Sequence, residues 1–221
     1  MTVTLYSYFR SSCSWRVRTA FNILKVPHVI KTINLLKNEQ QTAAFKSINP
    51  LGTVPAARLS SSGAVISQSL AIIDFFDRDR RLLPTEPVER ARCMQIAFTI
   101  ASDIQPVQNL SVLNRIKELA GEDARNKWAV DRNRSQLKII NDNLVEKHSD
   151  FCVGNSVTIA DVCLVPQLYS AARFGINIKE EFPHLNSIAK NLEQFEEFRM
   201  AHPHAQSDCP EDIKKLGVFF S

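Results

Sequence analysis

The sequence lacks any long hydrophobic run. None of its apolar stretches approaches the ~20 residues that a membrane-spanning helix needs, although 44% of its 221 residues are hydrophobic. The N-terminus enters a strand pattern directly, without the charged segment, apolar stretch and cleavage site of a secretory signal. We therefore expect neither membrane insertion nor secretion, and enough apolar surface for one large core or two smaller ones.

Cysteine is scarce and scattered. The five cysteines form no C-x-x-C pair, and neither they nor the five histidines have the spacing of metal ligands. An odd, scattered set of this kind is typical of reduced thiols in a cytoplasmic protein. We therefore predict no metal site and a cytoplasmic location.

The net charge of the chain is also small. The chain has 27 Lys and Arg against 23 Asp and Glu, a net charge of +4, and these residues are spread along its whole length. Proteins that bind nucleic acid usually gather basic residues on one face or helix. No nucleic-acid partner is expected.

What is present begins with an α/β pattern. Val3 and Leu5 alternate with polar neighbours, as in a strand, and Val17 and Phe21 then follow at helical spacing. Further along, the pattern predicts a strand over 28–35, a short helix over 40–47, strands over 54–59 and 64–67, and a helix with Ser69 as its N-cap. Residues 1–81 therefore read as a small α/β domain.

Two prolines in residues 82–87 break the helical pattern and predict a linker. Beyond it, helical periodicity appears over 90–101, 107–119, 126–147, 159–174 and 188–201, so residues 88–221 are expected to form an all-α domain. Thr158 and Asp161 have the spacing of a capping box and are assigned to folding. From Pro210 onward the sequence leaves open whether the tail, with Val218 to Phe220, packs on a neighbour.

Three junctions in the α/β half are candidates for a functional site. Ser11, Ser12 and Cys13 end a strand where a helix begins, and free N–H groups there favour a thiolate or a carboxylate. Val54-Pro55 would present an extended edge to a peptide. Only about one in twenty X-Pro bonds in folded proteins is cis, so the dipeptide alone does not predict a cis bond, and a trans proline at the first residue of a strand is the alternative. Gln68-Ser69 lies at another helix start. The three would converge only in one open sheet whose loops gather at one end.

These segments resemble the zeta class of glutathione transferases. The run Tyr6 to Arg18, which contains Ser-Ser-Cys-Ser-Trp-Arg-Val-Arg, is highly specific to that class. The other matching segments are Asn49-Pro50 with Val54-Pro55, Gln68 to Ile73, Ile104 to Ser111 and Val157 to Asp161. The resemblance implies a thioredoxin-like N-terminal domain that binds glutathione, an all-α C-terminal domain and a homodimer.

The resemblance also implies a reaction. Similar enzymes isomerise maleylacetoacetate to fumarylacetoacetate in tyrosine and phenylalanine breakdown, with glutathione as cofactor, and displace halide from small α-haloacids. Ser11 would donate a hydrogen bond to the glutathione sulfur and keep it ionised, with Ser12 and Cys13 in the same turn. An unperturbed thiol has a pKa of ~8.5 and is mostly protonated at neutral pH, so this donor would speed its addition to an electrophile.

The remaining glutathione contacts follow in the same way. Val54 would pair its backbone with the cysteinyl part ahead of a cis Pro55, and Gln68 and Ser69 would hold the γ-glutamyl end. A glutamine adds a contact; it is assigned to Gln41, with Gln40 as the alternative. The other residues expected at the glutathione site are Ser14, Trp15 and Arg16 in the first run, and Gln105, Asn109 and Ser111 in the helical domain.

A substrate with two carboxylates needs cationic partners, and guanidinium groups bind carboxylates through paired donors. Arg10, Arg16 and Arg173 are the candidates, each with a solvated surface arginine as the alternative. Arg18 lies one turn deeper and is interpreted as structural, paired with a nearby acid. Trp15 is most simply a packing residue.

Three alternatives remain open. A cysteine at a helix start is also the nucleophile of thiol-transferring relatives, so Cys13 could carry mixed-disulfide chemistry, although a serine follows it where those relatives usually have proline. A general detoxifying transferase is the related possibility. In a non-enzymatic reading, the fold serves only as a glutathione-binding dimerisation scaffold.

Overall fold

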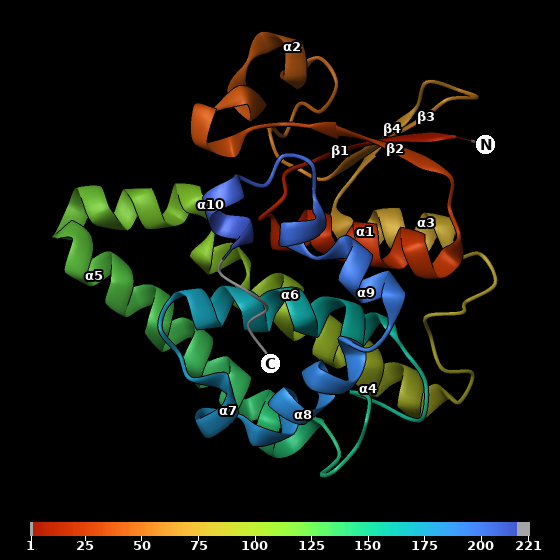
Figure 1. Cartoon of the computed structure of the whole chain (residues 1–221), viewed down its shortest axis with the longest axis vertical. Coiled ribbons are helices and arrows are strands. Elements are labelled where there is room, and N and C mark those ends of the chain that lie inside the picture. The colour runs from red at the N-terminus through yellow and green to blue at the C-terminus, as the bar shows by residue number, and fades with distance from the viewer. Residues whose placement is uncertain (1, 216–221) are drawn as a thin grey trace. The chain divides into compact units, whose positions relative to one another are not determined.

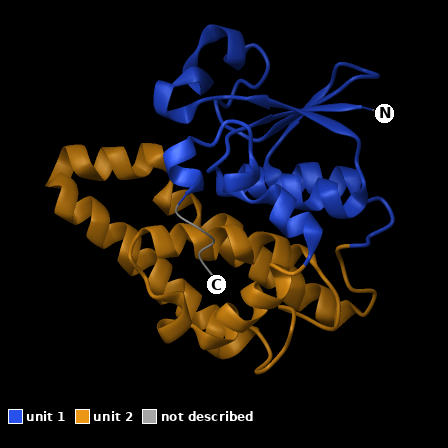
Figure 2. Ribbon diagram, in the orientation of Figure 1, with its two compact units in different colours: residues 1–81, 195–217 blue, residues 82–194, 218–221 orange. Residues whose placement is uncertain are grey.

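A computed structural model describes residues 2–215 of the chain. Its elements are a small sheet and many helices, shown in Figure 1. The described residues form two compact units (Figure 2): residues 2–81 with 195–215 make unit 1, and residues 82–194 make unit 2. Each unit has its own core.

Unit 1 contains one sheet with the strand order β2-β1-β3-β4. The parallel pair is β1 with β2, and both other pairs are antiparallel. The strands are β1 (Val3–Ser7), β2 (His28–Thr32), β3 (Ala56–Leu59) and β4 (Val65–Ser67), and the helices are α1 (Ser12–Leu24), α2 (Ala43–Lys46), α3 (Ser69–Phe76), α9 (Glu196–Ala201) and α10 (Glu211–Lys214). The thioredoxin-like fold expected for the N-terminal part is confirmed.

The core of unit 1 follows from the two periodicities of the sequence. Val3 and Leu5 in the central strand and Val17 and Phe21 in α1 have no exposed surface. In Figure 1, α1 and α3 lie on one side of the sheet and α2 lies on the other. Because the sheet is buried between these helices, the position of β1 is fixed, and with it the position of the turn that follows β1.

Several boundaries differ from the prediction. The second strand ends at Thr32 and not at residue 35, because the Asn34 side chain accepts hydrogen bonds from Leu36 N and Lys37 N and starts a 3₁₀ turn (Leu35–Lys37). The helix expected over 40–47 is divided into a 3₁₀ turn (Glu39–Gln41) and α2, which Thr42 caps. The third strand begins at Ala56, two residues later than predicted.

Within the described residues, unit 2 contains helices and no strand, as predicted. These are α4 (Pro87–Phe98), α5 (Leu110–Ile139), α6 (Ile159–Arg173), α7 (Ile178–Glu181) and α8 (Pro183–Leu192), with π-helical turns at Thr99–Ile104 and Ile140–Leu144 and a 3₁₀ turn at Pro106–Gln108. Inside α5, Gly121 has φ 86° and ψ 175°, which kinks the helix between the two segments that the sequence predicted separately.

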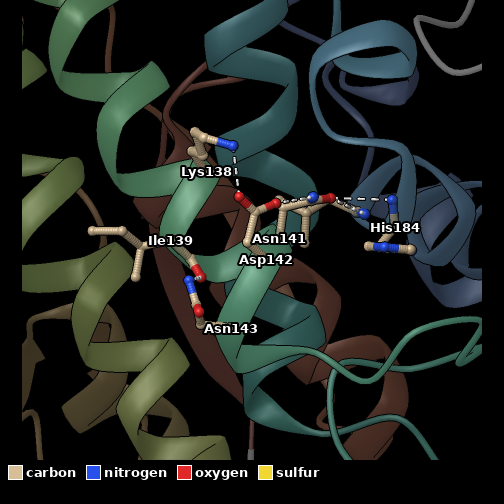
Figure 3. Close-up of polar contacts among 7 residues, drawn as sticks. Lys138, Ile139, Asn141, Asp142, Asn143 and His184 are labelled. Atoms are coloured by element: carbon tan, nitrogen blue, oxygen red, sulfur yellow. Dashed lines mark hydrogen bonds and ion pairs between the residues drawn. The ribbon is translucent and has the colours of Figure 1, made fainter.

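The helix predicted over 188–201 is wrong as a single element. It is split into α8 in unit 2 and α9 in unit 1, because residues 193–195 interrupt it. The start of α8 is capped by a residue that is distant in the sequence. Asn141 Oδ1 accepts hydrogen bonds from His184 N at 3.1 Å and Leu185 N at 3.3 Å. Figure 3 shows this amide between Asp142 and the backbone of His184.

The capping box at the start of α6 is confirmed. Thr158 N donates to Asp161 Oδ2 at 2.8 Å, and Cys152 N donates to Asp161 Oδ1 at 2.8 Å. Asp161 is fully buried. One carboxylate therefore caps the helix and also anchors the loop that precedes it.

The compact units differ from the expected domains in two places. Residues 195–215 belong with the N-terminal unit, because α9 packs on α1. The predicted linker, 82–87, begins with the buried Leu82, whose carbonyl accepts a hydrogen bond from Ile159 N inside unit 2. The apolar tail residues Val218 to Phe220 lie outside the described residues. None of the described helices is long and apolar enough to cross a membrane.

Candidate functional site

The three junctions singled out in the sequence lie at the same end of the sheet in unit 1. Tyr6 near the end of β1 pairs with Ala56 at the start of β3, and Ala56 pairs with Ser67 at the end of β4. The start of α1, the segment before β3 and the start of α3 are therefore neighbours. This is the edge at which open α/β sheets usually bind their ligands.

Ser11 is the N-cap of α1. Its Oγ accepts a hydrogen bond from Ser14 N at 3.2 Å, and its backbone N donates to Tyr8 O at 3.0 Å. Because the hydroxyl oxygen is the acceptor in this cap, its own hydrogen is left to donate to another group. Ser11, Ser12 and Cys13 are half-buried, whereas Ser14 is buried. The first three can thus face a ligand at a helix N-terminus.

Arg16 connects this turn to the start of α3. Its side chain is only 1% exposed, and Nη1 lies 3.4 Å from Ser69 Oγ and 3.9 Å from Cys13 Sγ. The prediction that Ser69 is the N-cap of α3 is wrong. Gln68 is the capping residue, with φ 70°, and Ser69 is the first helical residue. The hydroxyl of Ser69 is therefore directed to Arg16 and not to the helix backbone.

The segment before β3 has the geometry that the resemblance implies. The Val54-Pro55 peptide bond is cis, Pro55 is buried and Val54 is half-buried. Val54 packs against the core cluster of Tyr6 and Phe45. An extended residue at this position offers its backbone N–H and C=O to a peptide ligand.

Gln41 is held close to the same segment. Its Nε2 donates to Gly52 O at 3.2 Å. Gly52 has φ 60°, and a Cβ atom there would approach Gln40 O and Gln41 Nε2 to 3.1 Å, so this close approach requires glycine. Gln41 is exposed and Gln40 is half-buried. A ligand contact by Gln41 stays a prediction.

Two predicted site residues have other contacts. Arg10 is half-buried, and its guanidinium lies 5.8 Å from the centre of the Phe9 ring. Trp15 is 1% exposed and packs edge-to-face on His202, with ring centres 5.0 Å apart. The packing interpretation of Trp15 is therefore confirmed, and its burial argues against a direct glutathione contact.

Arg18 is buried and tied to the turn that carries Ser11. Its Nη1 donates to Ser7 Oγ at 3.0 Å and to Tyr8 O at 3.3 Å, and its Nη2 donates to Phe9 O at 2.9 Å. Nε and Nη2 both donate to Ala201 O. The expected acid is not the main partner of Arg18, because backbone carbonyls take that role. Burial lowers the pKa of Arg18 to about 9, and the nearby Asp208 opposes that shift.

Asp208 holds the same turn from the C-terminal segment. Its Oδ2 accepts a hydrogen bond from Phe9 N at 2.9 Å. Sequence reasoning missed Asp208 because 199 positions separate it from Phe9, and neither periodicity nor a local motif signals such a contact. Arg18 and Asp208 together fix the backbone from Ser7 to Phe9, directly before Ser11.

The predicted site residues of unit 2 lie at two places. Gln105 Nε2 donates to Asn109 Oδ1 at 2.6 Å; Asn109 precedes α5, and Ser111 is exposed in its first turn. Arg173 is exposed at the end of α6. Ligand contacts by these four residues stay predictions.

A ring of buried amides, which the sequence did not reveal, lies next to Asn109. Gln108 Nε2 donates to Gln167 Oε1 at 3.0 Å, Gln167 Nε2 donates to Asn133 Oδ1 at 2.6 Å, and Asn133 Nδ2 donates to Gln108 Oε1 at 2.7 Å. Each amide both donates and accepts, so the ring is satisfied without water. The ring connects the 3₁₀ turn Pro106–Gln108 to α5 and α6. This turn lies between Gln105 and Asn109.

Family profiles match both halves of the chain. The glutathione S-transferase N-terminal domain matches residues 10–79, and the glutathione S-transferase C-terminal domain matches residues 93–194. Maleylacetoacetate isomerase of Mus musculus is 40% identical over 215 residues, which cover 95% of this chain and 96% of that protein.

Solved structures agree with these matches. Maleylacetoacetate isomerase from Anaeromyxobacter dehalogenans 2CP-1, with bound glutathione in the active site, has a TM-score of 0.85 and 33% identity over 95% of this chain and 98% of its own. Maleyl pyruvate isomerase, described as a bacterial zeta-class glutathione S-transferase, has a TM-score of 0.86 and 31% identity over 94% of this chain and 100% of its own.

Proposed function

Since the chain belongs to the glutathione S-transferase family, we propose that it is a zeta-class enzyme that isomerises maleylacetoacetate to fumarylacetoacetate with glutathione as cofactor. The observation that carries this proposal is the Ser11 hydroxyl at the N-cap of α1, in the turn beside Arg16 and Ser69. The isomerases among its relatives, at up to 40% identity over nearly the full chain, support the same reaction.

The residues in this part of unit 1 suit an anionic tripeptide. Arg16 supplies a buried positive charge, and the N-termini of α1 and α3 supply backbone N–H groups. We expect Val54 to pair its backbone with the cysteinyl part and Gln68 and Ser69 to hold the γ-glutamyl part. Residues 1–81 would then contain most of the glutathione contacts, with Gln41 as a further one.

Bound glutathione would supply a thiolate as the nucleophile for reversible addition to the cis double bond of the substrate. The task of the protein is to keep that sulfur ionised. The free hydrogen of Ser11 and the partial positive charge of the α1 N-terminus both favour the ionised form. Ser12 and Cys13 line the turn and shape the space around the sulfur.

The substrate carries two carboxylates, for which we propose Arg10 and Arg173 as partners. Both side chains reach the protein surface, unlike that of Arg16. Gln105, Asn109 and Ser111 are proposed as polar contacts from unit 2. The same thiolate chemistry would displace halide from α-haloacids, which makes dehalogenation and general transferase activity natural side reactions.

Thiol transfer by Cys13 is the alternative activity. It is favoured by the half-buried thiol at a helix start, 3.9 Å from the Arg16 guanidinium. In that case the Cys13 sulfur, and not the Ser11 hydroxyl, would be essential. A non-catalytic glutathione-binding scaffold would need neither.

We also propose that the enzyme is a cytoplasmic homodimer. All five cysteines are free thiols, as expected in a reducing compartment. Val88 and Phe98 on α4 are 58% and 50% exposed, and exposed apolar side chains of this size favour association with a second subunit.

The test compares wild type, Ser11→Ala and Cys13→Ala in the glutathione-dependent isomerisation of maleylacetone, a stable substitute for the substrate. We expect Ser11→Ala to lose at least about tenfold in kcat/KM, because the thiolate loses a donor worth about one unit of its pKa, and Cys13→Ala to keep most activity. Ser61→Ala, in an exposed turn, is the control for the loss of a hydroxyl.

The reverse pattern would assign the chemistry to Cys13. An inactive wild type that still binds glutathione would contradict the isomerase proposal and favour the scaffold.

A further inference from the structure

We infer that Arg16 is a positioning residue that presents the Ser69 hydroxyl to the glutamyl α-carboxylate of glutathione. The inference deepens the proposed function and rests on it. The sequence predicted Arg16 both at the glutathione site and as a partner of the substrate, but its 1% exposed side chain puts it beneath the site surface. Its effect on a ligand must therefore pass through a neighbour.

The guanidinium of Arg16 is an unusual buried cation. Its Nε and Nη2 atoms have no hydrogen-bond partner within the part of the chain that the structure describes, and it forms no ion pair with any described carboxylate. A buried charge without a partner is costly, and a structural arginine is normally satisfied. Arg18, two residues further along α1, illustrates the satisfied case with hydrogen bonds from Nε, Nη1 and Nη2.

The contact between Arg16 and Ser69 has a direct chemical consequence. Arginine can only donate, so at the 3.4 Å contact Ser69 Oγ must act as the acceptor. The hydroxyl hydrogen of Ser69 is then left for another acceptor. A ligand that meets this hydrogen must itself present a lone pair, which excludes an ammonium group at that point.

The surroundings decide which acceptor fits. Ser69 is the first residue of α3, where the helix presents unpaired N–H groups and a partial positive charge. The unneutralised charge of Arg16 lies behind the hydroxyl. A hydroxyl donor, helix N–H groups and a buried cation all favour an anion, and the carboxylate of the γ-glutamyl end is the anion that the proposed ligand supplies there.

The experiment measures Kd by titration calorimetry for glutathione and for an analogue amidated at the glutamyl α-carboxylate. The proteins are wild type, Arg16→Gln, Arg16→Lys, Ser69→Ala and the double variant Arg16→Gln/Ser69→Ala. We expect Arg16→Gln to weaken glutathione binding by about 10- to 100-fold, the range of a charge-assisted hydrogen bond, and the amidated analogue much less. Arg78→Gln, an exposed change of the same charge, is the control.

Two further results are expected. The double variant should bind glutathione no more weakly than the weaker single variant, because Arg16 acts through Ser69. Arg16→Lys should recover part of the loss, since it keeps a donor and the charge, and this variant also serves if Arg16→Gln does not fold.

Equal weakening of both ligands by Arg16→Gln, or additive losses in the double variant, would overturn the inference and leave Arg16 a packing residue. A wild type that does not bind glutathione would instead overturn the proposed function. The two failures are therefore distinguishable.

Discussion

At the scale of the residue, two of the buried charges, Arg18 and Asp161, are held mainly by backbone groups. Arg18 donates to the carbonyls of Tyr8, Phe9 and Ala201, and Asp161 accepts from the amides of Cys152 and Thr158. Burial raises the pKa of Asp161, and these amides oppose the shift. A charge bound in this way fixes the path of the main chain, which an ion pair between two flexible side chains does not.

Asp161→Ala tests this role. The change leaves two buried N–H groups without an acceptor and removes the capping box, so we expect it to lower the free energy of unfolding by about 2–5 kcal/mol. Denaturation by urea measures the effect. Asp150→Ala, which removes an exposed carboxylate in the same loop region, is the control and should change stability little. Equal stability of Asp161→Ala and wild type would show that the buried amides find other acceptors.

At the scale of the element, the segment of residues 195–215 completes unit 1. In this segment, α9 packs against α1, the carbonyl of Ala201 accepts a hydrogen bond from the Arg18 side chain, and the carboxylate of Asp208 accepts one from Phe9 N. Asp208 holds the turn between β1 and α1 directly, and Ala201 holds it through Arg18, which donates to Tyr8 O and Phe9 O. The C-terminal segment therefore acts as a support for the turn that carries Ser11.

Asp208→Ala removes one of these supports. We expect it to lower kcat/KM for the glutathione-dependent reaction a few-fold, because the turn before Ser11 loses a fixed point, and to lower the free energy of unfolding by about 1–3 kcal/mol. Asp212→Ala removes an exposed carboxylate from the same segment and is the matched control. If both variants have the activity of wild type, Arg18 alone is sufficient to hold the turn.

At the scale of the whole molecule, His202 makes stability depend on pH. Burial lowers its pKa to about 4, and the charges of His204 and Arg18 add to this shift. His202 Nδ1 accepts from His204 N, and its ring packs on Trp15. In the unfolded chain its pKa is the usual ~6.5, so between these values the unfolded chain binds the extra proton and the folded chain does not.

The free energy of unfolding should therefore fall as the pH falls from about 6.5 to about 4, by on the order of 3 kcal/mol from this group. His202→Asn keeps a side-chain acceptor for His204 N but cannot be protonated in this range. Urea denaturation of both proteins at neutral pH and near pH 4.5 should give a smaller loss for the variant. His148→Asn, an exposed histidine, is the control; equal losses in His202→Asn and wild type would assign the acid sensitivity to other groups.

Local sequence patterns were sufficient to predict the α/β order of the first 81 residues, the helical second half, the capping box at Thr158 and the cluster of Ser11, Ser12 and Cys13 at a helix start. All of these depend on local periodicity and capping, which neighbouring residues specify. Strand pairing was needed to show that β1, β3 and β4 bring their junctions to one edge, and side-chain packing to show that Arg16 is buried against Ser69. The tertiary structure also showed that Arg18 and Asp208 hold the turn before Ser11 and that Gln108, Asn133 and Gln167 form a ring. These contacts join residues far apart in the chain, so strand register and packing select them, and no local pattern records them.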